Sequence, residues 1–277
     1  TVSFNTGTPF QSFSRNPQIR ITQSIGNLKL IGAALSQRDY ASRGPSPDDF
    51  SKTIASSQFL RNSSSPDLHL QLHYSVENPN NNNGLLFGAG AAYKTIVPRL
   101  SSEVNNLTYK VDEKVSGYTA IAFTKMVFTP LTIKLQGRYG ENIADLLSIS
   151  GFAVKNIVDP RTRERAYTSL HNMTLWGEIH SNGERVQLGI FGGYQQNLGT
   201  KEEMSGSANE VFGLGTNIET LYRISPRVIF NSNNYQIGAE LEYTSASYGS
   251  DFDVNYIPEN STTVANTRIL LSAKYSF

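Results

Sequence analysis

The sequence predicts an all-β fold, an antiparallel transmembrane β-barrel with 11–12 strands in this stretch. Apolar and polar residues alternate over long segments, the pattern of strands whose two faces meet different surroundings. Short turns alternate with long polar loops along the chain. No apolar run approaches the roughly 18 residues that a membrane helix needs. Together these three observations favour strands over helices as the membrane-spanning elements.

The composition narrows the class further. The chain has 277 residues, of which 38% are hydrophobic, with 14 Tyr, 14 Phe, 22 Gly and no Cys. The absence of Cys excludes a disulfide framework and cysteine catalysis. A formal net charge of +1 gives no broad basic field, so no nucleic-acid partner is expected. The composition fits either a soluble all-β protein or a membrane barrel with a polar lumen.

Eleven long strands are predicted from the alternation. They span residues 17–24, 28–36, 67–76, 84–94, 116–128, 131–139, 167–180, 184–195, 209–223, 235–247 and 265–277. In "DLHLQLHYSV", for example, Leu68, Leu70 and Leu72 share one face, and the intervening residues are polar. Residues 227–234 fit either a flap beside a turn or the start of the next strand. Residues 102–114 and 149–157 are predicted to form small hairpins outside the membrane.

The connections differ in length in an ordered way. Short turns are expected at 25–27, 129–130, 182–183 and 224–226, with a slightly longer one at 77–83. Long loops are expected at 37–66, 95–115, 140–166, 196–208 and 248–264. Short turns on one rim and long loops on the other are typical of outer-membrane barrels. We therefore expect the outer membrane of a Gram-negative bacterium, with the C-terminus on the periplasmic side.

Tyrosines lie mainly at the ends of the apolar faces. They are Tyr74, Tyr139, Tyr194, Tyr222, Tyr235, Tyr243 and Tyr275. Aromatic girdles occupy this position at the two membrane interfaces, whereas a soluble sandwich would concentrate aromatics in mid-strand. The tyrosine positions favour the membrane interpretation.

The number of strands bears on the domain organisation. Eleven is odd, whereas bacterial barrels have even strand numbers. We therefore expect residues 1–277 to form a single transmembrane barrel domain that lacks N-terminal strands, with "TVSF" at 1–4 as the tail of a missing strand.

Several segments carry a resemblance to a known family. "SRNPQIRITQSIGNLKLIGAALSQRDY" (14–40), "YKTIVPRL", "SPRVIF" and the final "YSF" are similar to segments of the DcaP-like porins. The resemblance covers nearly the whole chain. It implies a 16-stranded barrel, of which this stretch is the C-terminal part, and a homotrimer that passes small anionic solutes by diffusion.

The polar faces of the strands are expected to line the lumen. The predicted basic lining residues are Arg20, Lys29, Lys94, Lys134, Arg138, Arg185, Arg223, Arg268 and Lys274, with Lys125 added under one phasing of its strand. The predicted acidic ones are Asp67, Glu178, Glu219, Glu240 and Glu242. An excess of bases would give the lumen a positive potential and concentrate anions. The alternative is a mixed-charge lining in which opposite charges pair across strands.

The loop at 37–66 is long for a compact domain, which indicates a functional or disordered segment. Folded inward it would form a constriction, with Arg15, Arg38, Asp39, Tyr40 and Arg43 as rim candidates. The alternative is a surface loop that shields the barrel and contacts other subunits.

Catalytic and metal sites find little support in the sequence. His69 and His73 share a face, but four residues along a strand span about 13 Å, too far for one ion. No G-x-S-x-G motif is present. Loop carboxylates such as Asp251 and Asp253 lack an EF-hand pattern, and we expect them to be solvated rather than to bind calcium. We expect no catalytic residue, no metal, no cofactor and no enzymatic activity.

The sequence therefore predicts an outer-membrane porin for passive diffusion of small hydrophilic, anionic solutes, with membrane lipid and these solutes as its partners. One alternative is a barrel plugged by its loops, which would anchor or scaffold a surface complex. A second alternative is a soluble β-sandwich that binds carbohydrate.

Overall fold

The computed structural model describes residues 7–78, 80–81, 83–204 and 210–277. Eleven long antiparallel strands follow one another around one sheet in sequence order. They are β1 (Gln18–Ile25), β2 (Leu28–Leu35), β5 (Asp67–Asn78), β6 (Asn83–Ile96), β9 (Val115–Val127), β10 (Leu131–Glu141), β12 (Glu164–Ser181), β13 (Val186–Thr200), β15 (Ile218–Ser232), β16 (Tyr235–Tyr248) and β19 (Thr262–Tyr275). The predicted all-β antiparallel fold is confirmed.

The smaller elements belong to the long loops. β11 (Ser150–Asp159) pairs with both β12 and β14 (Val211–Leu214), which brings the sheet to 13 strands. Three hairpins stand apart: β3 (Arg43–Pro45) with β4 (Thr53–Ala55), β7 (Ser101–Val104) with β8 (Leu107–Lys110), and β17 (Asp251–Phe252) with β18 (Pro258–Glu259). The helices are α1 (Gln58–Asn62) and the 3-10 turn η1 (Ala144–Leu146).

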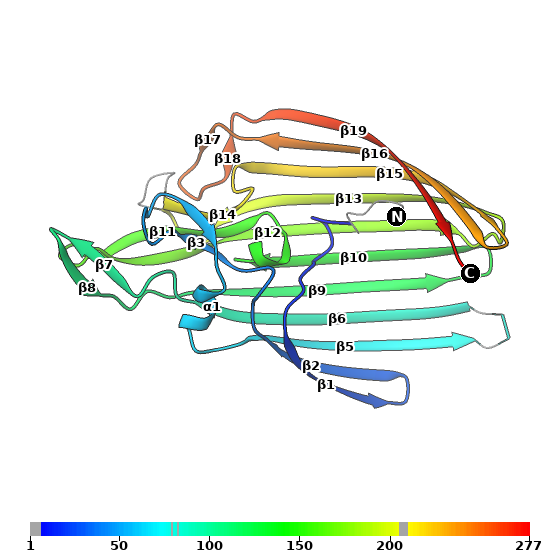
Figure 1. Ribbon diagram of the computed structural model, residues 1–277, viewed down its shortest axis with the longest axis horizontal. Coiled ribbons are helices and arrows are strands. Elements are labelled where there is room, and N and C mark those ends of the chain that lie inside the picture. The colour runs from blue at the N-terminus through cyan, green and yellow to red at the C-terminus, as the bar shows by residue number, and fades with distance from the viewer. Residues whose placement is uncertain (1–6, 79, 82, 205–209) are drawn as a thin grey trace.

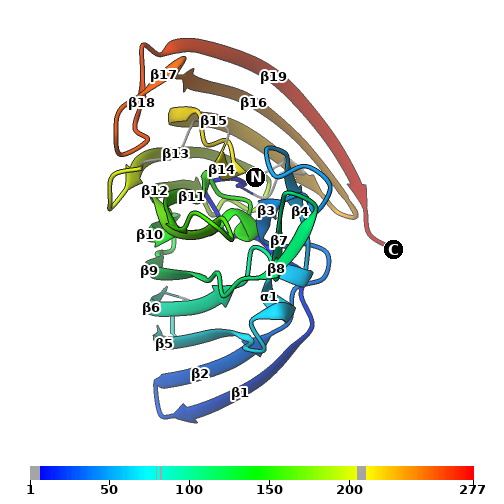
Figure 2. The same cartoon turned by 90° about the vertical axis from the view of Figure 1, so that its left-hand side faces the viewer.

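The sheet curves into an open arc with a convex and a concave side (Figures 1 and 2). β1 and β19 form its two edges, and within the described residues they do not pair with each other. Hairpins and loops gather at one end of the strands, and short turns join the strands at the other end (Figure 1).

The convex face is apolar and exposed. Leu70, Leu135, Leu188 and Leu271, on four different strands, are exposed by 56%, 48%, 61% and 79%. The concave face carries charged and polar side chains, many of them buried, such as Arg138 and Glu240. A sheet in water buries its apolar face, so this distribution is the reverse of the soluble pattern and matches strands with a lipid side and a polar lumen.

Aromatic residues frame the exposed apolar belt. All seven tyrosines expected at the ends of the apolar faces are exposed. Tyr93 pairs with Tyr118 and Tyr194 with Tyr222 across neighbouring strands toward the loop end. Tyr235 pairs with Tyr275 beside the turns. This is the two-row arrangement expected of interfacial girdles.

The predicted strand 209–223 and turn 224–226 are wrong. β15 runs on through Pro226 to Ser232, and the turn falls at 233–234, where Asn233 has a φ of 49°. Pro226 remains paired in register with Ile190 of β13, but the register with β16 is interrupted between Ile224 and Arg227. Proline lacks an N–H and so removes one ladder bond without ending the strand. Residue 209 lies outside the described residues.

Of the two small hairpins predicted outside the membrane, one is present and the other is not. β7 and β8 form the expected hairpin within 102–114. Residues 150–157 instead belong to β11, which pairs with β12 and β14 in the main sheet and is not a separate hairpin. The expected strand tail at 1–4 lies outside the described residues.

Apolar packing occurs beneath the loops more than between the long strands. One cluster joins Phe59 and Leu60 of α1 to Ile96 of β6, Phe152 of β11 and Phe212 of β14. This cluster ties the 37–66 loop to the loop-end extension of the sheet. Among the described residues, neither helix is long and apolar enough to cross a membrane.

Candidate functional site: the concave face

Strand alternation and register place the charged residues on one face in direct opposition. Lys134 of β10 is the register partner of Glu178 of β12, and Glu242 of β16 is that of Arg268 of β19. Directly paired positions have their Cβ atoms about 5 Å apart, which suits opposite charges. The local pattern within each strand therefore sets up ion pairs between strands.

Glu178 lies between two cations. Its Oε1 accepts a hydrogen bond from Lys134 Nζ at 2.8 Å, and its Oε2 lies 3.1 Å from Arg227 Nη1. Glu178 and Arg227 are buried and Lys134 is partly exposed. One carboxylate shared by two bases leaves the group with a net positive charge.

Glu242 has a similar environment. Arg268 Nη2 donates to Glu242 Oε1 at 2.9 Å, and Arg223 Nη1 lies 3.5 Å from Oε2. The Nε of Arg223 donates to Thr244 Oγ1 at 2.9 Å. Glu240, two residues away and also buried, is the register partner of Arg227. This region connects β15, β16 and β19 through charge.

Lys94 forms a buried ion pair with a loop residue. Its Nζ donates to Asp145 Oδ1 in η1 and, at 3.2 Å, to Ser42 Oγ. Gln37 Nε2 donates to the second Asp145 oxygen at 2.9 Å. The contact holds the 142–149 loop and the start of the 37–66 loop against the concave face.

Arg138 is surrounded by hydroxyl groups. Its Nη1 donates to Ser12 Oγ at 2.6 Å, and its Nη2 donates to Ser148 Oγ at 2.6 Å and Thr174 Oγ1 at 2.9 Å. Only 2% of this residue is exposed. Within the described residues no carboxylate lies within ion-pair distance, so the guanidinium contributes an unbalanced positive charge to this face.

Residues 7–16, here called the crossing segment, run over the concave face from the level of β13 toward β1 (Figures 1 and 2). Arg223 Nη1 donates to the carbonyl of Thr8 at 3.0 Å, and Phe13 N donates to the carbonyl of Leu146 at 3.2 Å. Phe10 is fully buried against β12, β13, β15 and β16. The segment therefore covers part of the polar wall.

The remaining predicted lining residues differ in their surroundings. Arg20, Lys29 and Lys274 share the concave register on the strands nearest the two edges, and all three are exposed. Glu219 lies beside the bulge between Ile218 and Thr220 at the loop end of β15. Their role as pore-lining residues stays a prediction.

Arg185 is a correction. The sequence placed it on the polar face of a strand beginning at 184, but β13 begins at Val186, and Arg185 lies exposed in the preceding turn. Its carbonyl accepts a hydrogen bond from the backbone N–H of Asn231. The turn that contains "NG" continues to Arg185 and is therefore longer than predicted. Arg185 comes before the strand in which side chains alternate between the two faces.

Two of the rim candidates lie next to each other in the loop that follows β2. Arg38 and Asp39 are exposed, with side chains 78% and 57% accessible, and form an ion pair of 3.8 Å with each other. An exposed side chain can face either bulk solvent or a lumen, so the role of these two residues at a constriction stays a prediction.

The other rim candidates contact the crossing segment or its surroundings. Tyr40 packs edge-on against Phe13 at 5.4 Å between ring centroids. Arg15 is exposed, with its guanidinium 5.4 Å from the Phe13 ring centroid. Arg43 is half-buried on β3. Both the stretch upstream of β1 and the part of the 37–66 loop that contains Ser42 therefore lie against the concave face.

Three important residues were missed by the sequence reasoning. Arg227 was missed because Pro226 was taken as a turn, although "RVIF" continues the alternation. Asp145 was missed because it meets Lys94, 51 residues earlier in the chain. Phe10 lies in a segment without periodicity, and no local signal marks its partners.

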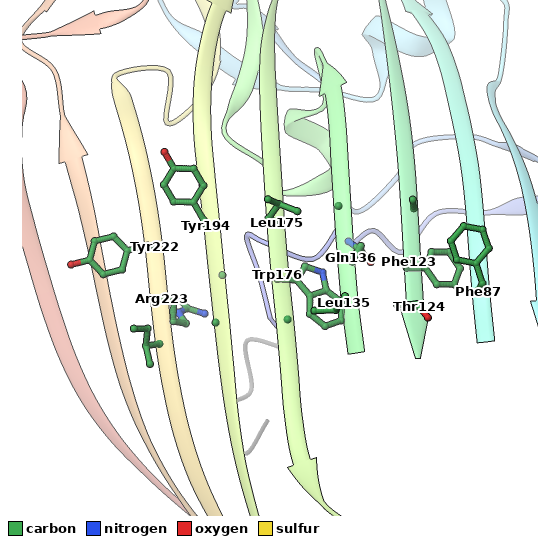
Figure 3. Close-up of a pocket in the computed structure, with 16 residues that line it drawn as sticks. Phe87, Phe123, Thr124, Leu135, Gln136, Leu175, Trp176, Tyr194, Tyr222 and Arg223 are labelled. Carbon is green, nitrogen blue, oxygen red and sulfur yellow. The ribbon is translucent and has the colours of Figure 1, made fainter. Parts of the chain in front are cut away.

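The convex face carries a shallow hollow of about 640 Å³ (Figure 3). Phe87, Leu135, Leu175, Tyr194 and Tyr222 stand around it. Its floor includes the paired Gly177 and Gly192 of β12 and β13, where side chains are missing from the outer surface. Most of its lining belongs to the apolar side, and Gln136, Trp176 and Arg223 of the concave face also contribute to it.

Two solved structures are similar to the chain. One is in-vitro folded OmpT, an outer membrane protein of Vibrio cholerae, with 10% identity, a TM-score of 0.48, and coverage of 93% of this chain and 63% of that chain. The other is outer-membrane expressed OmpT of Vibrio cholerae, with 11% identity, a TM-score of 0.49, and coverage of 93% and 64%. The chain thus spans less than two thirds of the length of either protein. Neither similarity is strong enough to assign a function.

No family model matches the chain, and no curated protein matches it. The resemblance to the DcaP-like porins is therefore not confirmed. The 16-stranded barrel and the homotrimer that it implied stay predictions.

The prediction that the chain is not an enzyme is not upheld. The two matched structures are named as outer membrane proteins, and the fold is all that they share with this chain. One fold can host unrelated functions, so a fold of this kind does not exclude catalysis. In the part of the chain that the structure describes, no cluster of three or more His, Asp or Glu is arranged to hold a metal ion.

Proposed function

We propose that the protein is an outer-membrane porin through which small hydrophilic solutes, preferentially anions, diffuse down their gradient. The observation that carries the proposal is the reversed sheet: exposed leucines on the convex face and buried charges on the concave face. Only lipid outside and water inside make both faces favourable. The lipid-facing belt, framed by tyrosines, would span the membrane with the turns and the C-terminus on the periplasmic side.

The charge distribution supports anion preference. Bases outnumber carboxylates on the concave face from β10 to β19: the bases are Lys134, Arg138, Arg223, Arg227 and Arg268, and the carboxylates are Glu178, Glu240 and Glu242. Walls of low dielectric constant focus such a field and raise the local concentration of anions. Part of the expected mixed-charge pairing is also present, so selectivity would be moderate rather than absolute.

A closed wall is part of the proposal. β1 and β19 present unpaired backbone groups along their edges, which hydrocarbon cannot satisfy. Their outer faces are apolar, as shown by Ile21 and Leu271, exposed by 74% and 79%. We infer that additional strands close the barrel in the membrane.

The decisive test is conductance of the purified protein in planar bilayers. We expect discrete, salt-dependent openings, and a reversal potential under a KCl gradient with the sign of anion preference. A folded barrel should also migrate as a compact band before boiling and more slowly after it. Openings with cation preference would contradict the anionic part, and silence of a correctly folded barrel would contradict the porin itself.

A second candidate is a plugged barrel that anchors a surface complex. It is favoured by the crossing segment and the η1 loop, which cover the concave face so that Arg138 is only 2% exposed. Silence in bilayers together with normal heat-modifiable migration would support this candidate over the porin.

A further inference from the structure

The crossing segment is attached to the concave wall by an aromatic side chain. Phe10 is 0% exposed, and its ring lies 6.1 Å from that of Phe191 between centroids. Trp176 packs against the same cluster, and the guanidinium of Arg223 lies 5.5 Å from the Phe10 ring centroid. An aromatic ring on the polar face of a membrane strand needs such a niche, because water would otherwise surround it.

The niche exists because β13 has a glycine at its floor. A Cβ built on Gly193 would lie 2.5 Å from Cγ of Phe10, closer than any real side-chain contact. The adjacent Gly192 faces the convex side, where a Cβ would meet nothing within 4 Å. The two glycines of "IFGGYQ" thus lie on opposite faces of the sheet. The absence of a side chain at Gly193 leaves the space that the ring of Phe10 occupies.

Polar contacts fix the segment on both sides of this ring. Arg223 binds the Thr8 carbonyl, and Arg138 donates to Ser12 Oγ. Phe13 then donates to the Leu146 carbonyl, and the Asn16 side chain accepts from Arg38 N at 3.0 Å. The contacts extend from β15 to the 37–66 loop, so hydrogen bonds hold the segment along its whole length.

A cavity lies beside the segment. Ser12, Phe13 and Ser14 form one side of a cavity of about 270 Å³. His69 and Gln71 of β5 and Thr119 of β9 contribute to the other side. Its lining combines hydroxyl, amide and imidazole groups, which could contact a hydrated solute, with apolar side chains such as Phe13, Ile121 and Leu146.

We propose that the crossing segment forms the constriction of the channel, and that Phe10, seated on Gly193, sets the upper size of the solutes that pass. This inference rests on the proposed porin function. Small polar solutes pass between the segment and the β5–β6–β9 wall. The size limit follows from the position of the segment, which is determined by Phe10.

The test compares four variants of the full chain in planar bilayers. Phe10→Ala removes the anchor, and Gly193→Ala leaves no room for the ring, so each should raise the single-channel conductance about twofold through a wider cross-section. The double variant should resemble Phe10→Ala alone, because the clash needs both groups and the effects are then not additive. Gly192→Ala is the matched control and should conduct like the unmodified protein.

A second readout separates size from charge. Liposomes containing the protein should swell in neutral sugars up to a limiting size, and that limit should rise in Phe10→Ala and Gly193→Ala but not in Gly192→Ala. Heat-modifiable migration verifies that each variant is folded. Normal conductance with an unchanged size limit in both Phe10→Ala and Gly193→Ala would overturn the constriction and leave the porin standing. Silence of the unmodified protein and of every variant would overturn the porin. Conductance in Phe10→Ala alone would support an occluding segment and contradict an open channel.

Discussion

The two faces of the same strands obey opposite rules. On the convex face, Leu135 and Leu188 are exposed although they are apolar. On the concave face, Arg138 and Glu178 are buried although they carry charge. In water each arrangement would be unfavourable, and a membrane outside with a wet lumen inside makes both favourable. The contrast teaches that burial alone does not identify the core of this protein.

The loop layer follows the rules of a soluble protein. There Phe152 and Phe212 are buried in an apolar cluster, and Glu113 is held by Arg99 through two hydrogen bonds of 2.8 and 2.7 Å. The molecule therefore combines a reversed sheet with an ordinary core beneath its loops. Substitutions can tell these regions apart.

The largest effect is expected from a charge in the apolar belt. Leu135→Arg, midway between Leu131 and Tyr139 on the convex side of β10, should cost about 2–4 kcal/mol of folding free energy in a bilayer, since hydrocarbon does not solvate the guanidinium. Denaturant unfolding in lipid vesicles would measure the loss.

The matched control for this change is Gln136→Arg, one residue further on and therefore on the concave face. Its loss should be much smaller. Equal losses from the two variants would remove the distinction between the faces, and with it the membrane assignment.

A medium effect is expected from charge removal on the concave face. Arg138→Gln keeps polar contacts but deletes a cation that lacks a carboxylate partner among the described residues, so the reversal potential in a KCl gradient should shift toward cations. Arg185→Gln, in the turn, should shift it far less, because bulk solvent screens an exposed charge. A larger shift from Arg185→Gln would place the selective region at the turns.

The smallest effect is expected in the loop layer. Tyr167 donates to Glu113 Oε2 at 2.6 Å, and Tyr167→Phe should cost about 1 kcal/mol of local stability. Burial, and then the charge of Glu113, raise the pKa of Tyr167 above its ordinary value. Above pH of about 10 the unfolded segment would lose its proton while the folded one keeps it, so loop stability should fall there.

Hydrogen exchange of the loop backbone as a function of pH would measure both effects. Tyr167→Phe should lack its share of the alkaline loss. Tyr109→Phe is the control, since that hydroxyl has no hydrogen-bond partner among the described residues. The same alkaline loss in Tyr167→Phe as in the unmodified protein would assign the titration to another group.

Alternation by itself determined which way the side chains of the long strands face. Leu70, Leu135, Arg138 and Glu178 follow from a period of two, because that period is a property of the extended backbone and needs no knowledge of distant partners. The same logic predicted the tyrosine rows. It failed at Arg185 and Arg227, where a longer turn and a proline concealed the true limits of a strand.

Tertiary structure alone decided what the lumen contains. Phe10 meets Gly193, and Lys94 meets Asp145, through contacts between segments far apart in the chain. Such contacts are made by loops whose sequences show no periodicity. The conformation of these loops depends on the side chains of the sheet against which they pack. The two faces of the sheet were therefore predictable from the sequence, and the contacts of the crossing segment were not.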